Sequence, residues 1–348
     1  MPRISARVPL RLGLAGGGTD LSAYADVHGG AVLNATINRY AYVFLEPTGS
    51  EKVEFCAADL GIHEELKLTH EGLATSKLVL HSGVIKSLTQ RVGDVRDVFE
   101  CLRGTRVTTF VDAPAGSGLG SSSALVVGLL KAFTEKLGIL LNPSNLALIA
   151  YQIERKDLGL SGGRQDHYSA AYGGINFLEF YGKERTIVSP LSVPGHFLNE
   201  FESSLVICFT GISRSSENII NQQNSELNSG AGKTALEAMH QMKQDAVAMV
   251  GHVMAGRMAG IASTMNHSWQ AKKRTATAVS TECIDRLYAI AMEQGALSGK
   301  VSGAGGGGFM MFIVPPMRRY SIITALNAAG GTASGVQLVS RGAQVWSS

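Results

Sequence analysis

Residues 114–125, PAGSGLGSSSAL, constrain the fold of this chain more than any other stretch. The apolar run 107–111 precedes them and the apolar run 124–130 follows, so the pattern predicts a strand, a glycine loop and the start of a helix. Glycines let the backbone approach a ligand, and the serines offer hydroxyls and free amides where the helix dipole carries about half a positive charge. Because such a loop favours anions, we predict that it binds phosphate; a turn that merely caps the helix is the alternative.

The better-known nucleotide loops are absent. A Walker A loop ends in Lys-Ser or Lys-Thr, and the pair Lys233-Thr234 has Leu227 where the first glycine belongs, so we expect only a loop leading into a helix there. Residues 303–308 satisfy the GxGxxG spacing, but the apolar run 309–314 after them predicts a strand where a dinucleotide site needs a helix. A glycine-loop oxidoreductase is therefore not expected.

Composition indicates a soluble globular protein. The 348 residues are 45% hydrophobic and 17% charged, which suits two domains or one large one. A net charge of +3 is too small to predict binding to nucleic acid or to an anionic membrane surface. The four cysteines are far apart without a CxxC pair, and the N-terminus lacks the apolar stretch of a signal peptide. We expect free thiols, a cytoplasmic location and small-molecule partners, with a homo-oligomer left possible.

Hydrophobic periodicity predicts mixed strands and helices, an α+β fold. Strands are expected at 4–12, 39–45, 53–56, 107–111, 174–181, 204–209 and 309–314. Helices are expected at 80–91 (amphipathic), 124–130, 145–157, 215–228, 235–253 and 282–293. Two prolines and a glycine within 188–199 suggest a domain boundary. We therefore predict an N-terminal nucleotide-binding domain, 1–190, and a C-terminal domain, 191–348, that completes the site.

The chain has two more glycine loops with polar or charged neighbours. They lie in residues 9–20 (PLRLGLAGGGTD) and 300–311 (KVSGAGGGGFMM). In order, the three loops resemble the three motifs of the GHMP kinases, the galactokinase, homoserine, mevalonate and phosphomevalonate kinase superfamily. Further phrases, IERKDLG, GGRQDHYSAAYGG and SWQAKK, are most similar to the bacterial D-glycero-D-manno-heptose 7-phosphate kinases. The resemblance implies a two-domain fold: an N-terminal domain like ribosomal protein S5 domain 2 and a ferredoxin-like C-terminal domain, with the nucleotide between them.

The resemblance assigns ATP and Mg²⁺ as cofactors. The ATP-binding residues would be Pro114, Gly116, Ser117, Gly118, Leu119, Gly120, Ser121, Ser122 and Ser123. Ser122 and Glu154 match the magnesium ligands of the family, although the neighbouring serines leave Ser121 or Ser123 possible. An ordinary charged helix surface is the competing interpretation of Glu154.

Asp166 matches the catalytic aspartate of galactokinase and mevalonate kinase, and Arg11 matches the basic residue beside it. From the residues alone, a solvated carboxylate at Asp166 is as well supported as one that lines a pocket. In phosphoryl transfer such a carboxylate would accept the proton of the sugar hydroxyl, or only orient it, while the arginine faces the γ-phosphate.

The sugar would bind where the first loop ends. Gly17, Gly18, Thr19 and Asp20 match the sugar-binding end of the first galactokinase motif, with glycines where galactokinase has larger polar residues, which opens the pocket to a bulkier sugar. Further predicted substrate-binding residues are Gly163, Arg164, Arg214, Lys272, Lys273 and Gly305. A substrate that already bears a phosphate needs cations, for which Arg214, Lys272, Lys273 and Arg274 are candidates. A solvated basic helix face is the competing interpretation.

The resemblance implies ATP-dependent phosphorylation of the C1 hydroxyl of D-glycero-D-manno-heptose 7-phosphate to the 1,7-bisphosphate, in nucleotide-activated heptose synthesis for capsule or lipopolysaccharide. Two alternatives stay open: a kinase of an unphosphorylated sugar such as fucose or galactose, and a non-catalytic sugar sensor.

Overall fold

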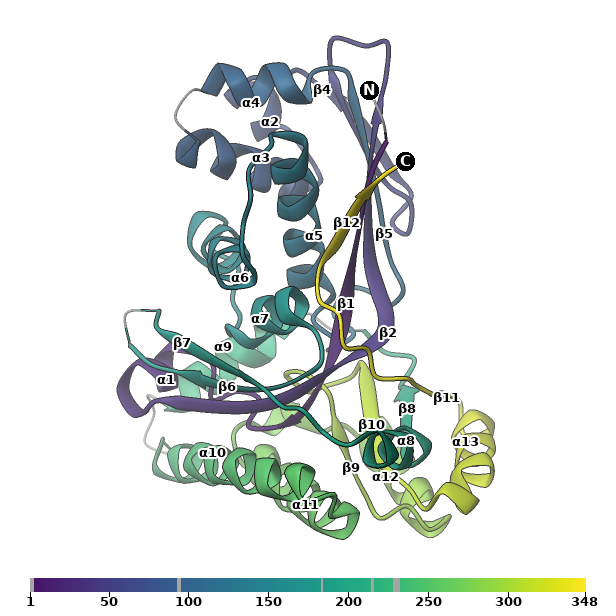
Figure 1. The fold of residues 1–348 in the computed structure, drawn as a ribbon. Coiled ribbons are helices and arrows are strands. Elements are labelled where there is room, and N and C mark those ends of the chain that lie inside the picture. Colours follow the sequence, from purple (N-terminus) through teal and green to yellow (C-terminus); the bar gives the residue numbers. More distant parts are fainter. Residues whose placement is uncertain (1–2, 93–94, 183, 214–215, 228–231) are drawn as a thin grey trace.

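The computed structural model describes residues 3–92, 95–182, 184–213, 216–227 and 232–348. Within these residues two sheets are packed with helices (Figure 1). The first sheet has the strand order β12-β1-β2-β5-β3-β4, with β6 paired to β2 and β7 paired to β6. Its strands are β1 (Ile4–Ala15), β2 (Gly30–Pro47), β3 (Val53–Ala57), β4 (Ile62–Leu66), β5 (Thr105–Val111), β6 (Ile175–Phe180), β7 (Thr186–Pro190) and β12 (Gln344–Ser347).

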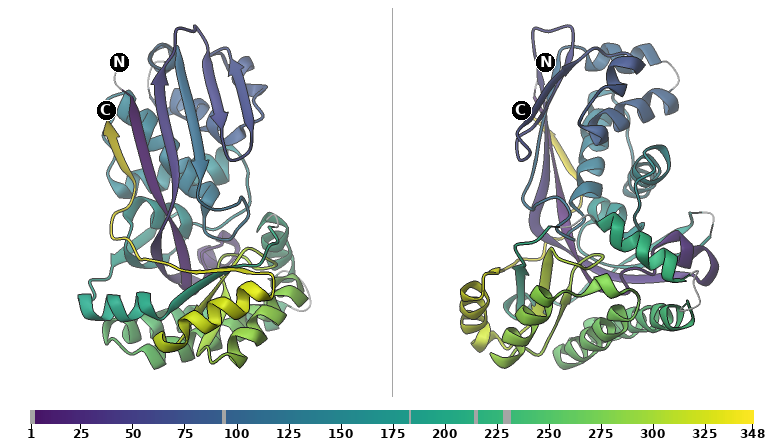
Figure 2. Two further views of the ribbon diagram at one scale, coloured as in Figure 1. Left: turned by 90° about the vertical axis from the view of Figure 1, so that its right-hand side faces the viewer. Right: turned by 180° about the vertical axis from the view of Figure 1, so that it is seen from behind.

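Helices of the first half pack on this sheet, and Figure 2 (left) shows the strands of its upper part forming the opposite surface. Helix α10 (Gly232–Met254) of the second half also packs on β1 and β2. The helices of the first half of the chain are α1 (Ser22–His28), α2 (His70–Ala74), α3 (Val79–Arg91), α4 (Val95–Leu102), α5 (Ser121–Lys136), α6 (Pro143–Gln152) and α7 (Gln165–Tyr172). Helix α5 packs on β1 and β2, which are neighbours in this sheet. The glycine loop of residues 114–120 joins β5 to α5, a strand to a helix, as the sequence predicts.

The second sheet has the order β11-β8-β10-β9, from β8 (Leu205–Phe209), β9 (Ser298–Val301), β10 (Phe309–Ile313) and β11 (Thr332–Gly335). The helices here are α8 (Gly195–Ser203), α9 (Ser216–Leu227), α10 (Gly232–Met254), α11 (Met258–Lys273), α12 (Glu282–Glu293) and α13 (Arg319–Ala328). The third glycine loop joins β9 to β10, so a strand follows it, as predicted. No helix among the described residues is long and apolar enough to span a bilayer.

The two halves share a hydrophobic core. One buried cluster contains Leu12 and Val127 of the first half together with Ile207 and Met311 of the second. Strand β12 returns to pair with β1, although it belongs to the range 191–348. The proposed division at residues 190 and 191 therefore separates the strands of the two sheets except for β12.

Several predicted elements need correction. The helix expected at 80–91 is buried on most of its surface rather than amphipathic, because α4 and α5 both pack against it. The helix expected at 145–157 is α-helical only to Gln152, and Ile153–Asp157 form a π-helical turn. Lys233 and Thr234 lie in the first turn of α10 rather than in a loop before it. All four cysteines are free, as expected.

Candidate active site

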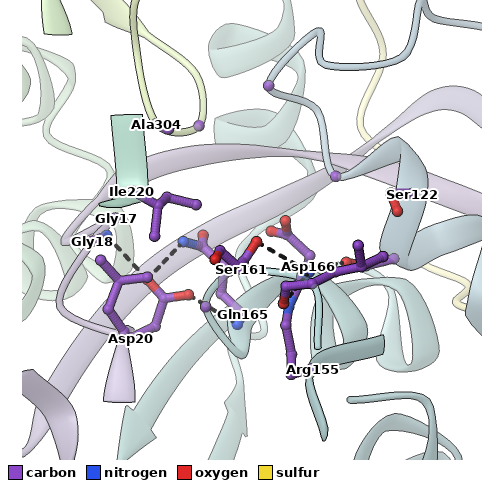
Figure 3. Close-up of a pocket in the computed structure, with 18 of the residues that line it drawn as sticks. Gly17, Gly18, Asp20, Ser122, Arg155, Ser161, Gln165, Asp166, Ile220 and Ala304 are labelled. Atoms are coloured by element: carbon purple, nitrogen blue, oxygen red, sulfur yellow. Dashed lines mark hydrogen bonds between the residues drawn. The ribbon is translucent and has the colours of Figure 1, made fainter. Parts of the chain in front are cut away.

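One pocket lies where the three glycine loops meet (Figure 3). Its walls come from the loop after β1, the start of α5, the segment 154–166, helices α9 and α11, and the loop between β9 and β10. In Figure 3, Asp20 lies at one end of the labelled residues and Ser122 at the other, with Gln165 and Asp166 between them. The predicted sugar loop and the predicted phosphate loop therefore lie on opposite sides of the Asp166 carboxylate.

The predicted phosphate side of the pocket is built from the start of α5. Gly120, the N-cap residue, has the left-handed φ of 76°, and a Cβ there would lie 3.1 Å from Asp166 Cγ, so glycine is needed for both reasons. Of the predicted ATP-binding residues, Gly116, Gly118, Gly120, Ser121, Ser122 and Ser123 line the pocket. The other three do not line it: Leu119 is in the core, the carbonyl of Ser117 accepts a hydrogen bond from Phe309 N (2.8 Å), and Pro114 is exposed.

Arg11 and Asp166 form the predicted pair in the middle of the pocket. Arg11 Nε and Nη2 both contact Asp166 Oδ1 at 2.6 Å, while Nη1 donates to the carbonyl of Gly118 (2.6 Å) and to Ser302 Oγ (3.2 Å). The register between β1 and β2 shifts between Pro9 and Leu10, directly before this arginine. One buried guanidinium thus joins the carboxylate to the second and third glycine loops.

The predicted sugar side is organised by Asp20, which is buried. Its Oδ1 accepts hydrogen bonds from Gly18 N and Gln165 Nε2, both at 3.0 Å, and its Oδ2 accepts one from Gln165 N at 3.1 Å. A Cβ on Gly163 would overlap Asp20 Oδ2, so glycine is required for this close approach. Thr19 does not line the pocket, because its hydroxyl donates to backbone carbonyls of Gly16 and Ala31.

Glu154 lies in the π-helical turn and is 99% buried, which corrects its interpretation as a surface charge. Ser122 Oγ and Ser123 Oγ both donate to this carboxylate, and His167 Nε2 lies 2.7 Å from its Oε2. Burial raises the pKa of Glu154, but the charge of Arg155 and the contact with His167 outweigh burial and lower the pKa to about 2. The carboxylate is therefore ionised at neutral pH.

Lys272 of α11 is buried at the pocket, where its Nζ donates to the carbonyl of Gly17 (2.9 Å). Burial lowers its pKa to about 8; the charge of Asp20 opposes this shift and that of Arg11 adds to it. The structure thus contradicts the solvated-face interpretation for this lysine. Lys273 does not line the pocket and lies over the ring of Trp269, with Nζ 5.7 Å from the centroid.

Other predicted substrate-binding residues are not brought to the pocket. The guanidinium of Arg164 is buried beside α1, where it contacts Asp26 and donates to the carbonyl of Tyr181 (2.7 Å). Gly305 packs against Val279 rather than the pocket. Arg214 lies outside the described residues.

Sequence reasoning missed Gln165 in the pocket and two buried residues behind it, His167 and Lys300. Gln165, Asp166 and His167 are consecutive, yet the first contacts Asp20, the second Arg11 and the third Glu154. Lys300 of β9 is buried and its Nζ donates to the carbonyl of Gly13 (2.6 Å). The signal for Gln165 and His167 was their place beside Asp166 at the start of a helix; Lys300 offered only its place before the third loop.

The chain matches two family models: GHMP kinases N terminal domain over residues 79–174, and GHMP kinases C terminal over residues 238–332. A D-glycero-alpha-D-manno-heptose 7-phosphate kinase of Campylobacter jejuni is 39% identical over 346 residues, or 99% of each chain. A crystal structure described as a D-glycero-D-manno-heptose 1-phosphate kinase of Bacteroides thetaiotaomicron has a TM-score of 0.81 at 37% identity, covering 99% of this chain and 98% of that one. Galactokinase of Lactococcus lactis, complexed with galactose, covers 98% of this chain and 95% of its own at 18% identity and a TM-score of 0.73, which shows the shared fold alone.

Proposed function

The chain belongs to the GHMP kinases, and on that premise we propose that it transfers the γ-phosphoryl group of ATP to the C1 hydroxyl of D-glycero-D-manno-heptose 7-phosphate. The observation that carries this proposal is the Arg11–Asp166 pair, which lies between the serine loop and the Asp20 side of the pocket. The relative named a heptose 7-phosphate kinase supports this acceptor. The product is a 1,7-bisphosphate, which we place in nucleotide-activated heptose synthesis for capsule or lipopolysaccharide.

ATP would bind along the serine loop, because the free amides and the dipole at the start of α5 favour phosphate oxygens. Ser122 and Glu154 fit a magnesium site: their oxygens are in hydrogen-bond contact, the carboxylate is ionised, and both line the pocket. Mg²⁺ prefers hard oxygen ligands and takes one or two protein carboxylates together with phosphates and water. When bound, the ion would neutralise charge on the transferring phosphoryl group.

Asp166 would accept the proton of the acceptor hydroxyl. Both contacts from Arg11 are made to Oδ1, and within the described residues no hydrogen bond reaches Oδ2. The side chain keeps 20% of its exposure, on the wall of the pocket. Arg11 fixes the orientation of this carboxylate and supplies positive charge where charge develops during transfer.

Acceptor comparison tests the proposal. We expect ADP release with Mg-ATP to be far faster on D-glycero-D-manno-heptose 7-phosphate than on the same heptose without phosphate, on the heptose 1-phosphate, or on galactose or fucose. The heptose 1-phosphate is the control for the acceptor position, because its C1 oxygen already carries a phosphate and cannot accept another. Turnover on a free sugar alone would keep a kinase but remove the phosphate requirement. Nucleotide binding without turnover on any acceptor would favour the sensor.

Lys272 is the cation proposed to contact the phosphate of the acceptor, since two of its N–H groups remain after the bond to Gly17. Replacing it with methionine is expected to raise KM for the sugar phosphate about 10- to 100-fold, as for a lost charge-assisted hydrogen bond, with KM for ATP little changed. Lys273→Met is the matched control, because that neighbour lies on Trp269. Steady-state kinetics would contradict the assignment if both variants behaved alike.

The same lysine predicts a pH dependence. Its pKa is lowered to about 8, so the charged form predominates below that pH and is lost as pH rises through 8. We expect kcat/KM for the sugar phosphate to fall above pH 8 in the wild-type enzyme, and Lys272→Arg to remove this decline because arginine keeps its charge. A pH profile that declines equally in both proteins would point to another group.

A further inference from the structure

The carboxylate of Glu154 is held at both oxygens by different neighbours. Oε1 accepts from Ser122 Oγ and lies 3.4 Å from Arg155 Nη1, and both of these residues line the pocket. Oε2 is contacted by Ser123 Oγ and His167 Nε2, each at 2.7 Å. One oxygen therefore shares its surroundings with the proposed magnesium ligand Ser122, while the other is held by a buried imidazole.

Among the described residues, the His167 side chain makes one hydrogen bond, from Nε2 to Glu154 Oε2. The side chain is fully buried, and its Nδ1 has no hydrogen-bond partner among the described residues. The ring of Tyr151 packs edge-on against the imidazole, with centroids 5.7 Å apart and planes at 86°, which restricts its rotation. Burying a polar group lowers the stability of the fold unless the group is hydrogen-bonded. The single hydrogen bond of this buried imidazole goes to Glu154, which implies that the histidine acts on that carboxylate.

We infer that His167, assisted by Ser123, is a positioning residue that holds Glu154 Oε2 so that Oε1 faces the magnesium ion beside Ser122. The inference rests on the proposed function, in which these two oxygens hold the ion. Residues that hydrogen-bond to a metal ligand orient it, and their loss typically weakens metal binding about 10- to 100-fold. The assignment gives the second and third residues of α7 separate tasks: Asp166 serves the acceptor hydroxyl, and His167 serves the metal side.

Magnesium binding tests this inference without turnover. We would titrate Mg²⁺ calorimetrically into the protein saturated with a non-hydrolysable ATP analogue, for the wild type, His167→Leu and His167→Gln. We expect His167→Leu to weaken Mg²⁺ binding about 10- to 100-fold, and His167→Gln, which keeps a donor, to recover much of the loss. Affinity for the analogue in EDTA should stay within about twofold, because among the described residues neither ring nitrogen hydrogen-bonds to the serine loop.

His81→Leu is the matched control, since His81 is also a buried histidine with one polar contact, to Thr109 Oγ1 at 2.9 Å, away from the pocket. It should leave Mg²⁺ affinity at the wild-type value. If His167→Leu does not fold, Ser123→Ala is the second test and should also weaken Mg²⁺ binding. Wild-type affinity in His167→Leu and in Ser123→Ala would overturn this inference alone. A wild-type protein whose analogue complex binds no Mg²⁺ would overturn the proposed metal site as well.

Discussion

Asp166→Asn is expected to lower kcat by about 10²- to 10⁴-fold while the affinity for ATP stays within about twofold. The amide keeps the size of the side chain but cannot accept the proton of the acceptor hydroxyl at neutral pH. ATP binding should survive, because the serine loop is held by α5 and the third glycine loop rather than by this carboxylate. Single-turnover rates, with binding of a fluorescent ATP analogue, would measure both quantities.

Asp157→Asn provides the control for that change. Asp157 also pairs with an arginine, Arg91 at 2.9 Å, but the pair lies outside the pocket and is about one-third exposed. Its loss should leave kcat within about twofold, because an exposed ion pair contributes little to stability. Near-normal kcat in Asp166→Asn would show that Asp166 does not take part in the reaction. A large loss of kcat in both variants would indicate that the enzyme is generally sensitive to the loss of a negative charge.

Arg11→Met is expected to lower kcat about 10²- to 10³-fold, comparable to the loss of one electrostatic contact to a transition state. Its guanidinium contacts Asp166, Gly118 and Ser302 at once. Arg11→Lys should recover only part of the activity, because an ammonium group cannot make this forked set of contacts. Steady-state kinetics at saturating ATP and acceptor would measure the change.

Arg7→Met is the matched control on the same strand. Arg7 lies over the ring of Tyr40, 4.7 Å from its centroid, and its Nη2 donates to Gln344 Oε1. These contacts are away from the pocket, so we expect kcat to be unchanged. Equal losses in the two variants would mean that Arg11 acts through the stability of β1 rather than through the reaction.

Much of the fold follows from local pattern. The family and its two-domain fold, which the resemblance of the three glycine loops to the GHMP motifs implied, are confirmed by the family models and by the heptose kinase structure. The strand before the serine loop and the helix after it were predictable because apolar spacing acts locally. The serines do not cap this helix, because they lie in its first turn and its N-cap is Gly120, without a side-chain cap hydrogen bond. Strand β12 was not, because a short terminal strand pairs with β1 through contacts that span almost the whole chain.

For the site as well, local sequence pattern does not show which side chain reaches the pocket. Arg3, just before β1, and Arg7 and Arg11 within it recur every four residues, and a shift in strand register, invisible in the sequence, precedes the arginine that reaches the pocket. Likewise, Lys272 and Lys273 are neighbours, yet helix geometry directs one to the first glycine loop and the other to Trp269. Long-range packing decides which member of such a set reaches the pocket.

The position of the new phosphate tests the central claim most directly. After reaction of D-glycero-D-manno-heptose 7-phosphate with Mg-ATP, ³¹P NMR should show the original 7-phosphate signal together with a second signal coupled to the anomeric proton. That result would identify C1 as the acceptor served by Asp166. A new phosphate coupled to any other sugar proton, or ADP formed without a new sugar phosphate, would contradict the account.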